Sequence, residues 1–154
     1  MVNVMNFIKL RLCLAFSLLF LIYGISFADI NKKSRPEVAD VIKAWEGTQG
    51  EQVWTLRYGR KEEHKSLVQI NNIDHAWNKK IHLMSTEEKN GGTRYYTHIN
   101  NEKHVILITN QYSGELYLPD EKNVIHLQFD KELSSEGNPQ HFLTDYLNIK
   151  AKIK

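Results

Sequence analysis

The stretch KKIHLMSTEEKNGGTRYYTHI, residues 79–99, carries the clearest fold signal in the chain. Ile81 and Leu83 occupy every second position, a period of two that is typical of a β-strand. Asn90-Gly91-Gly92 follows, and these residue types readily adopt the backbone angles of a tight turn. The sequence therefore predicts a β-hairpin with strands over residues 79–89 and 93–99.

Similar patterns continue on both sides of this hairpin, for example where Trp54, Leu56 and Tyr58 alternate with other residues. The connections between these segments are too short for parallel crossovers, so neighbouring strands must run antiparallel. We expect an α+β fold: an antiparallel meander of about six to seven strands, forming a curved sheet or partly closed barrel. The further strands are predicted at residues 53–58, 67–71, 104–110, 115–118 and 124–129.

Two helices are predicted to bracket the strands. Ser34-Arg35-Pro36-Glu37 has the pattern of a capping box, and Gly47 ends the run that follows it. The apolar residues between them have helical spacing: Val38, Val41, Ile42 and Trp45. A short C-terminal helix is predicted over residues 140–148, started by Asn138-Pro139. Its apolar side consists of Phe142, Leu143, Tyr146 and Leu147.

The N-terminal segment has the three parts of a secretory signal peptide. Lys9 and Arg11 precede the uncharged run from Leu12 to Ala28, which ends in Ser26-Phe27-Ala28, a small-x-small cleavage pattern. The alternative is an uncleaved anchor helix, but the run is shorter than the roughly 20 residues that a membrane span needs. We expect cleavage after Ala28, a signal peptide over residues 1–28, a single mature globular domain over residues 29–154, and a periplasmic or secreted location without stable membrane insertion.

Composition narrows the possible partners of this mature domain. Of the 154 residues, 42% are hydrophobic and 25% charged, as in ordinary globular proteins. Removing residues 1–28 leaves 18 basic and 18 acidic residues, so net charge gives no reason to expect nucleic acid as a partner. The only cysteine, Cys13, lies in the signal segment, which leaves the mature domain without a disulfide or a thiol nucleophile.

Catalytic and cofactor signatures are absent from the sequence. It contains no GxGxxG, GxxxxGK[ST], HExxH or GxSxG motif, and we expect neither an enzyme nor a cofactor. Imidazoles on neighbouring strands can converge on a metal, as His98, His104 and His126 would. However, His126 alternates with apolar residues and so should face solvent, and no fixed ligand spacing supports coordination. We therefore predict no metal site.

The most pointed local feature is Tyr112-Ser113-Gly114-Glu115-Leu116-Tyr117. Ser113-Gly114 is expected to form a turn before a strand, which would place a hydroxyl and an unhindered backbone at an exposed corner. Tyr112 and Tyr117 would add flat amphipathic surface beside it. We therefore predict a partner-binding site at Tyr112, Ser113, Gly114 and Tyr117; the alternative is an ordinary hairpin turn followed by a tyrosine that packs on the sheet.

Ser113-Gly114-x-x-Tyr117 resembles the Ser-Gly-x-x-Tyr motif of bacterial periplasmic lysozyme inhibitors, small exported antiparallel β domains whose motif loop plugs the glycosidase active site. The resemblance implies that Ser113 faces the catalytic carboxylates of the target and that Tyr117 supports the loop. It covers five residues, and the second motif of that family, a Tyr followed by a Lys-Gly pair, has no counterpart in this chain.

These observations favour an exported binding protein that inhibits or neutralises another protein. The expected partner is a lysozyme-like or other peptidoglycan hydrolase, or a toxin against which the chain acts as an immunity protein. Two alternatives remain: a structural or interaction component of an envelope complex, and a carrier that holds a small apolar ligand in the concavity of the sheet.

Overall fold

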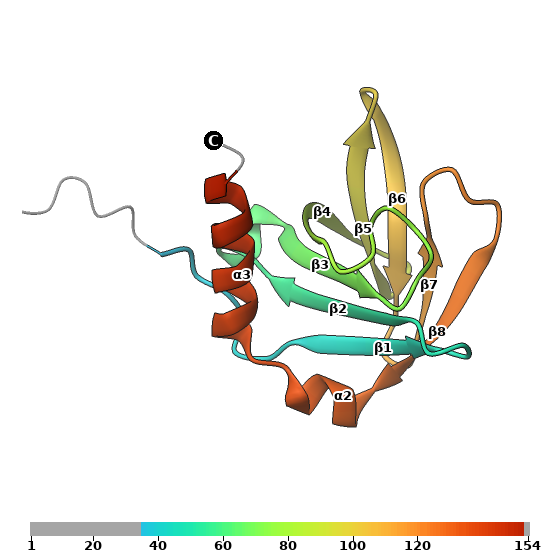
Figure 1. Ribbon diagram of the computed structural model, residues 1–154, viewed down its shortest axis with the longest axis horizontal. Coiled ribbons are helices and arrows are strands. Elements are labelled where there is room, and N and C mark those ends of the chain that lie inside the picture. Colours follow the sequence, from blue (N-terminus) through green and yellow to red (C-terminus); the bar gives the residue numbers. More distant parts are fainter. Residues whose placement is uncertain (1–34, 153–154) are drawn as a thin grey trace, which may run out of the picture. The chain divides into compact units, whose positions relative to one another are not determined.

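Eight antiparallel strands follow one another around a closed barrel (Figure 1). The structure, a computed structural model, describes residues 35–152; the predicted signal peptide of residues 1–28 and Ser34 of the predicted helix cap lie outside this range. From Pro36 onward the described residues belong to one compact unit. The strands are β1 (Lys43–Gly47), β2 (Gln52–Arg57), β3 (Lys65–Asn71), β4 (Ile81–Lys89), β5 (Gly92–Ile99), β6 (Glu102–Thr109), β7 (Ser113–Tyr117) and β8 (Val124–Asp130).

Closure comes from antiparallel pairing of the first strand with the last. Ala44 pairs with Asp130 and Trp45 with Phe129, so β1 lies between β2 and β8. The rings of Trp45 and Phe129 meet edge to face inside the barrel, with centroids 5.9 Å apart. The predicted antiparallel meander is confirmed, but it has eight strands in place of the expected six to seven, because β1 joins it, and it closes fully. Closure leaves neither terminal strand with an unpaired edge.

The predicted N-terminal helix is wrong in the part that can be compared, because β1 occupies residues 43–47. Two neighbouring residues of this strand are buried on opposite faces: Trp45 points into the barrel, and the backbone of Ala44 on the other side contacts the helix α2 (Lys131–Glu136). Two successive buried residues break the alternation of apolar and polar residues, and the apolar spacing then also fits a helix. Val41, expected on the buried stripe, is 65% exposed.

The barrel interior is filled with large apolar side chains over most of its length. A bulge lets β6 add two of them in sequence: the register between β5 and β6 shifts after Tyr95, and both Ile106 and Leu107 are buried. The interior cluster comprises Trp45, Val53, Val68, Ile70, Ile73, Met84, Tyr95, Ile106, Leu107, Leu116, Leu118 and Leu127.

The predicted C-terminal helix is confirmed as α3 (Pro139–Lys152), which packs against the outside of the barrel. Asn138 starts it as expected, since its side-chain oxygen accepts from the N–H groups of Gln140 and His141, each at 3.0 Å. Phe142, Leu143 and Tyr146 are buried against the outer face of β2, β3 and β4, whose contributing residues include Leu56, Leu67 and Ile81. Within residues 35–152, no helix is long and apolar enough to cross a membrane.

The loop between β3 and β4, residues 72–80, packs against one end of the barrel. Trp77 stacks on the His82 ring at 4.1 Å and contacts the interior cluster. His75 fixes the loop: one ring nitrogen donates to the carbonyl of Pro119 at 3.1 Å, and the other accepts the Trp77 N–H at 3.1 Å. Nε2 of His82 is buried and has no hydrogen-bond partner among the described residues.

This packing makes stability depend on pH. Burial, with smaller contributions from the charges of Lys80 and His75, lowers the pKa of His82 below its ordinary value. The unfolded chain then takes up more protons than the folded chain below about pH 6.5, so stability is full above that pH and falls as pH drops. A single titrating group changes stability by at most about 1.4 kcal/mol per pH unit. The total loss is limited as well, because the ring is only half buried.

Urea unfolding at about pH 7.5 and about pH 5.5 measures this effect. We expect a His82→Phe variant, which keeps a ring on Trp77 without a titrating group, to lose less stability between the two pH values than the unmodified chain. The exposed His141 provides the control, and His141→Gln should behave like the unmodified chain. Equal pH dependence in all three proteins would show that His82 does not carry it.

Candidate functional site

The turn between β6 and β7 is built around the side chain of Asn110. Its carbonyl oxygen accepts the backbone N–H groups of Tyr112 and Ser113, each at 2.8 Å, while its amide nitrogen donates to the Ser113 hydroxyl at 2.9 Å. The backbone N–H of Asn110 also donates to the carbonyl of Ser113 at 2.9 Å. An asparagine side chain that accepts backbone N–H groups in this way can hold a short turn that contains no glycine.

Tyr112 stands at the tip of this turn. Its carbonyl accepts the N–H of Phe129 at 2.8 Å, which ties the turn to the barrel wall, while its side chain is 72% exposed. When a partner buries an exposed aromatic ring whose backbone is already fixed, the ring loses little conformational freedom. The turn therefore presents an aromatic contact in a preset position.

The expected turn at Ser113-Gly114 is wrong, because these two residues begin strand β7. Gly114 pairs with Leu127 of β8 and with Thr109 of β6, and the Asn110 side chain already completes the reversal before Ser113. A Cβ atom on Gly114 would lie 3.3 Å from the carbonyl oxygen of Ile108, so glycine here permits close approach of neighbouring strands.

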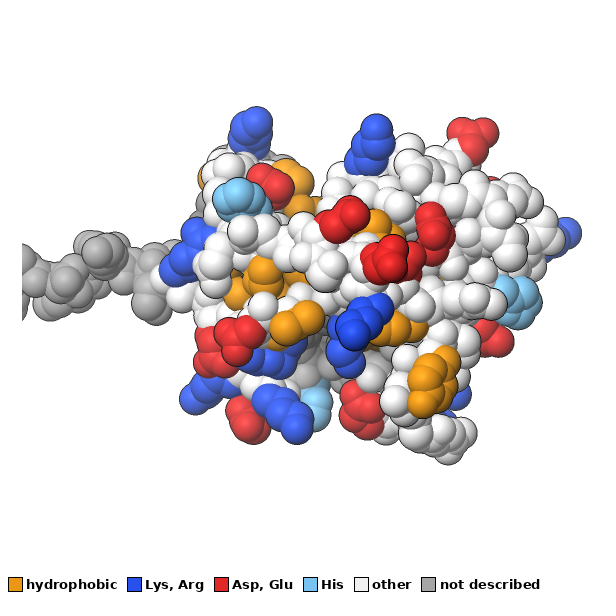
Figure 2. All heavy atoms as spheres, turned by 90° about the horizontal axis from the view of Figure 1, so that it is seen from below, with side chains coloured by type: hydrophobic (Ala, Val, Ile, Leu, Met, Phe, Trp, Pro, Cys, Tyr) orange, Lys and Arg blue, Asp and Glu red, His pale blue; other side chains and the backbone are white. Residues whose placement is uncertain are grey.

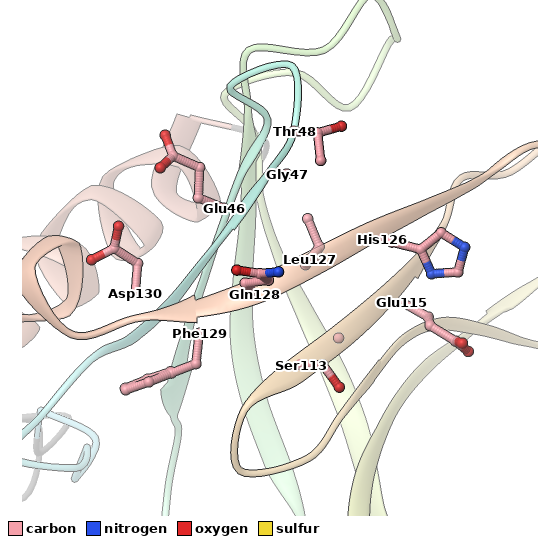
Figure 3. A pocket seen from close by; sticks show the side chains of 11 residues that line it. Glu46, Gly47, Thr48, Ser113, Glu115, His126, Leu127, Gln128, Phe129 and Asp130 are labelled. Atoms are coloured by element: carbon pink, nitrogen blue, oxygen red, sulfur yellow. The ribbon is translucent and has the colours of Figure 1, made fainter.

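Ser113 and Gly114 line a groove of about 470 Å³ across β7, β8 and β1 (Figure 3). Gln128 lies at its centre, since it pairs with Ser113 on one side and with Glu46 on the other. The lining residues are Glu46, Gly47, Thr48, Ser113, Gly114, Glu115, His126, Leu127, Gln128, Phe129 and Asp130.

Opposite charges lie on the two sides of the start of β7. The groove contains the carboxylates of Glu46, Glu115 and Asp130, and no lysine or arginine is among its described lining residues. A second hollow of about 220 Å³ shares Ser113, Gly114 and Glu115 but extends toward β4 and β5, where Lys89 and Arg94 line it. Figure 2 shows several carboxylate side chains close together on the face seen from below. The segment 113–115 is therefore a ridge between an acidic and a basic depression.

Tyr117 is not part of the groove lining, although it points to the same outer side of β7 as Ser113 and Glu115. Its hydroxyl donates to Oε2 of Glu115 at 2.5 Å. This hydrogen bond, aided by partial burial, raises the pKa of Tyr117 above its ordinary value. Of the four predicted site residues, the structure thus joins Tyr112, Ser113 and Gly114 at one corner and places Tyr117 further along the strand.

Sequence reasoning missed the residues that organise this corner. Asn110 is a common turn former, and its position just after an apolar strand was an available signal. Gln128 and Glu46 approach the ridge only through the pairing of β8 with β7 and β1, which no local pattern contains. His126, expected to face solvent, is exposed on β8 and pairs with Glu115.

The other two histidines considered as metal ligands lie on the hairpin of β5 and β6. His98 pairs with Lys103 and His104 with Thr97. Among residues 35–152, no three His, Cys, Asp or Glu side chains come together in a way that could hold a metal ion.

Comparison of the chain with protein-family models, curated proteins and solved structures finds no match. The geometry of the corner therefore has to support any functional conclusion by itself.

The role of Asn110 can be tested by amide hydrogen exchange. In Asn110→Ala, we expect the Tyr112 and Ser113 amides to exchange at least about tenfold faster, because they lose their acceptor, with about 1 kcal/mol or less of overall destabilisation. Asn110→Asp keeps the accepting oxygen and should preserve much of the protection. Unchanged exchange in the alanine variant would show that the turn does not depend on this side chain.

Proposed function

We propose that this chain is an exported periplasmic binding protein that inhibits or neutralises a partner protein, and that the corner formed by Tyr112, Ser113 and Gly114 makes the central contact. The observation that carries the proposal is the exposed Tyr112 ring on a turn fixed by Asn110. Tyrosine is enriched among residues that dominate binding energy, above all when it is held in place before binding.

The charge pattern around the ridge supports a protein partner of defined orientation. A partner seated on residues 113–115 would place basic groups over the acidic groove and acidic groups over Lys89 and Arg94. Charges arranged in this way favour one orientation and speed association. The proposed partner is a lysozyme-like or other peptidoglycan hydrolase, or a toxin, as the signal-type N-terminus and the Ser113-Gly114-x-x-Tyr117 resemblance suggest.

The resemblance and the geometry support different residues as the main contact. By resemblance, Ser113 faces the catalytic carboxylates of the target and Tyr117 supports the loop. In the structure, the side chain most available to a partner is that of Tyr112, since Tyr117 is half buried and bonded to Glu115. We therefore place Tyr112 at the centre of the proposed contact, with Ser113 beside it and Tyr117 holding Glu115 at its edge.

The first experiment expresses the full chain with its native N-terminus in a bacterium and collects the periplasmic fraction. We expect the recovered protein to be shorter than the encoded chain by about 28 residues. That protein is then added to a lysozyme assay that follows the clearing of a peptidoglycan suspension, and next to assays with other peptidoglycan hydrolases. Full-length protein in the membrane fraction would contradict export as a soluble binding protein.

The second experiment measures affinity for whichever hydrolase is inhibited. Tyr112→Ala should weaken binding by roughly 30-fold, about 2 kcal/mol, because a central aromatic contact is lost. Its melting temperature should barely change, because the ring is exposed. Ile149→Ala, which truncates an exposed apolar residue of α3, is the matched control and should leave affinity unchanged. Unchanged affinity of Tyr112→Ala would exclude this corner as the contact.

A further inference from the structure

The interior of the barrel changes in character toward the end that carries the β6–β7 turn. There the inward positions hold short hydroxyl side chains in place of large apolar ones, including Thr55 on β2, Ser66 on β3 and Thr93 on β5. Short side chains cannot fill an eight-stranded barrel, whose interior is just wide enough for large ones. A hollow of about 310 Å³ therefore remains at this mouth, at the lower end of the sizes that hold small ligands.

Several hydroxyl groups line the inner wall of the mouth. Thr55 and Ser66 are each only 4% exposed, and the Ser66 hydroxyl donates to the carbonyl of Leu56 at 2.9 Å. The buried phenol of Tyr95 is hydrogen-bonded to the hydroxyls of Thr55 and Thr109. These groups offer a ligand fixed hydroxyl partners at the base of the hollow, while Ala39 and Val41 add apolar surface to its lining.

The rim of the mouth is mainly basic. Lys43, Arg57, Lys61 and Lys65 line it together with His64, and Glu88 is the one carboxylate among the described lining residues. Some of this charge is already neutralised, since Arg57 pairs with Glu37 at 3.0 Å and Lys65 with Glu63 at 3.6 Å. Glu88 accepts a hydrogen bond from Thr93 at 2.9 Å.

Two of the rim lysines form no salt bridge within the described residues. Neither Lys43 nor Lys61 lies within 4 Å of a carboxylate oxygen anywhere in residues 35–152. They extend from β1 and from the 3-10 helix η1 (Lys61–Glu63), elements that are separate in sequence and both line this rim. Two free ammonium groups above a wall of hydroxyls form an arrangement that attracts and orients a small anion.

We propose that the barrel mouth binds a small organic anion, whose acidic group pairs with Lys43 and Lys61 and whose polar body contacts Thr55, Ser66 and Tyr95. The acidic group is a carboxylate or a phosphate, which both match ammonium donors. The site is separate from the groove beside Ser113, with which it shares no lining residue.

Titrations of the full chain with three probes at constant ionic strength test this site. Citrate represents carboxylates, glucose 6-phosphate represents organic phosphates, and inorganic phosphate tests for an anion without an organic body. NMR should show saturable shifts of the amides of Thr55, Ser66 and Tyr95 with citrate or glucose 6-phosphate, and at least tenfold weaker binding of inorganic phosphate. Failure of both organic probes to shift these amides, or binding of inorganic phosphate as tight as theirs, would overturn the proposal.

Two kinds of variant distinguish a built site from general attraction to a basic surface. Lys43→Gln combined with Lys61→Gln should weaken binding at least tenfold, whereas Lys122→Gln, at an exposed lysine outside the mouth, should leave it unchanged. Thr86→Leu keeps every charge but fills part of the hollow, and should also weaken binding. Equal affinity in the double lysine variant or in Thr86→Leu would contradict a ligand held inside the mouth.

Discussion

The pairing of β1 with β8 is the constraint on which the rest of the structure depends. It turns a meander into a closed barrel, so that Trp45 and Phe129 meet inside it and neither strand is left as an exposed edge. The outside of this seam is held as well. Ser134 of α2 accepts the N–H of Ala44 at 2.8 Å and donates to the carbonyl of Asp130 at 2.5 Å, and thereby joins both strands to the helix. The same seam brings Glu46 of β1 beside Gln128 of β8, and so creates one wall of the groove next to Ser113.

Closure also separates two barrel ends with different chemistry. At one end the β3–β4 loop seats Trp77 on His82 and against the apolar interior. At the other end, buried hydroxyls and rim lysines surround a hollow, and the Asn110 turn carries Tyr112 on the same rim. The two proposed binding sites thus share the end of the barrel where hydroxyl side chains line the interior. The packing of Trp45 and Leu107 that stabilises the fold lies in the barrel interior.

The sequence predicts those elements whose signals are local. The alternation in residues 79–99 and the Asn138 cap of α3 each lie within one segment, and both predictions are confirmed. The apolar spacing of β1 also fits a helix, because the neighbouring residues Ala44 and Trp45 are buried on opposite faces, and α2 is too short to give a periodic pattern. At the candidate site, Tyr112, Ser113 and Gly114 were identified from one motif. Asn110, Gln128 and the lysines of the barrel mouth were not, because their roles arise from contacts between strands far apart in sequence.

Residue-resolved amide hydrogen exchange of the two terminal strands tests the closed barrel most directly. If β1 and β8 pair, the hydrogen-bonded amides of both strands should be protected from exchange. The degree of protection in β1 (Lys43–Gly47) and β8 (Val124–Asp130) should be similar to that in β2 and β3. Open edges would behave differently, because the unpaired N–H groups of an edge strand exchange with solvent while those facing the neighbouring strand stay protected. Protection along both sides of β1 and β8 is the result we predict; rapid exchange of the amides that face the seam would contradict closure and, with it, the groove beside Ser113.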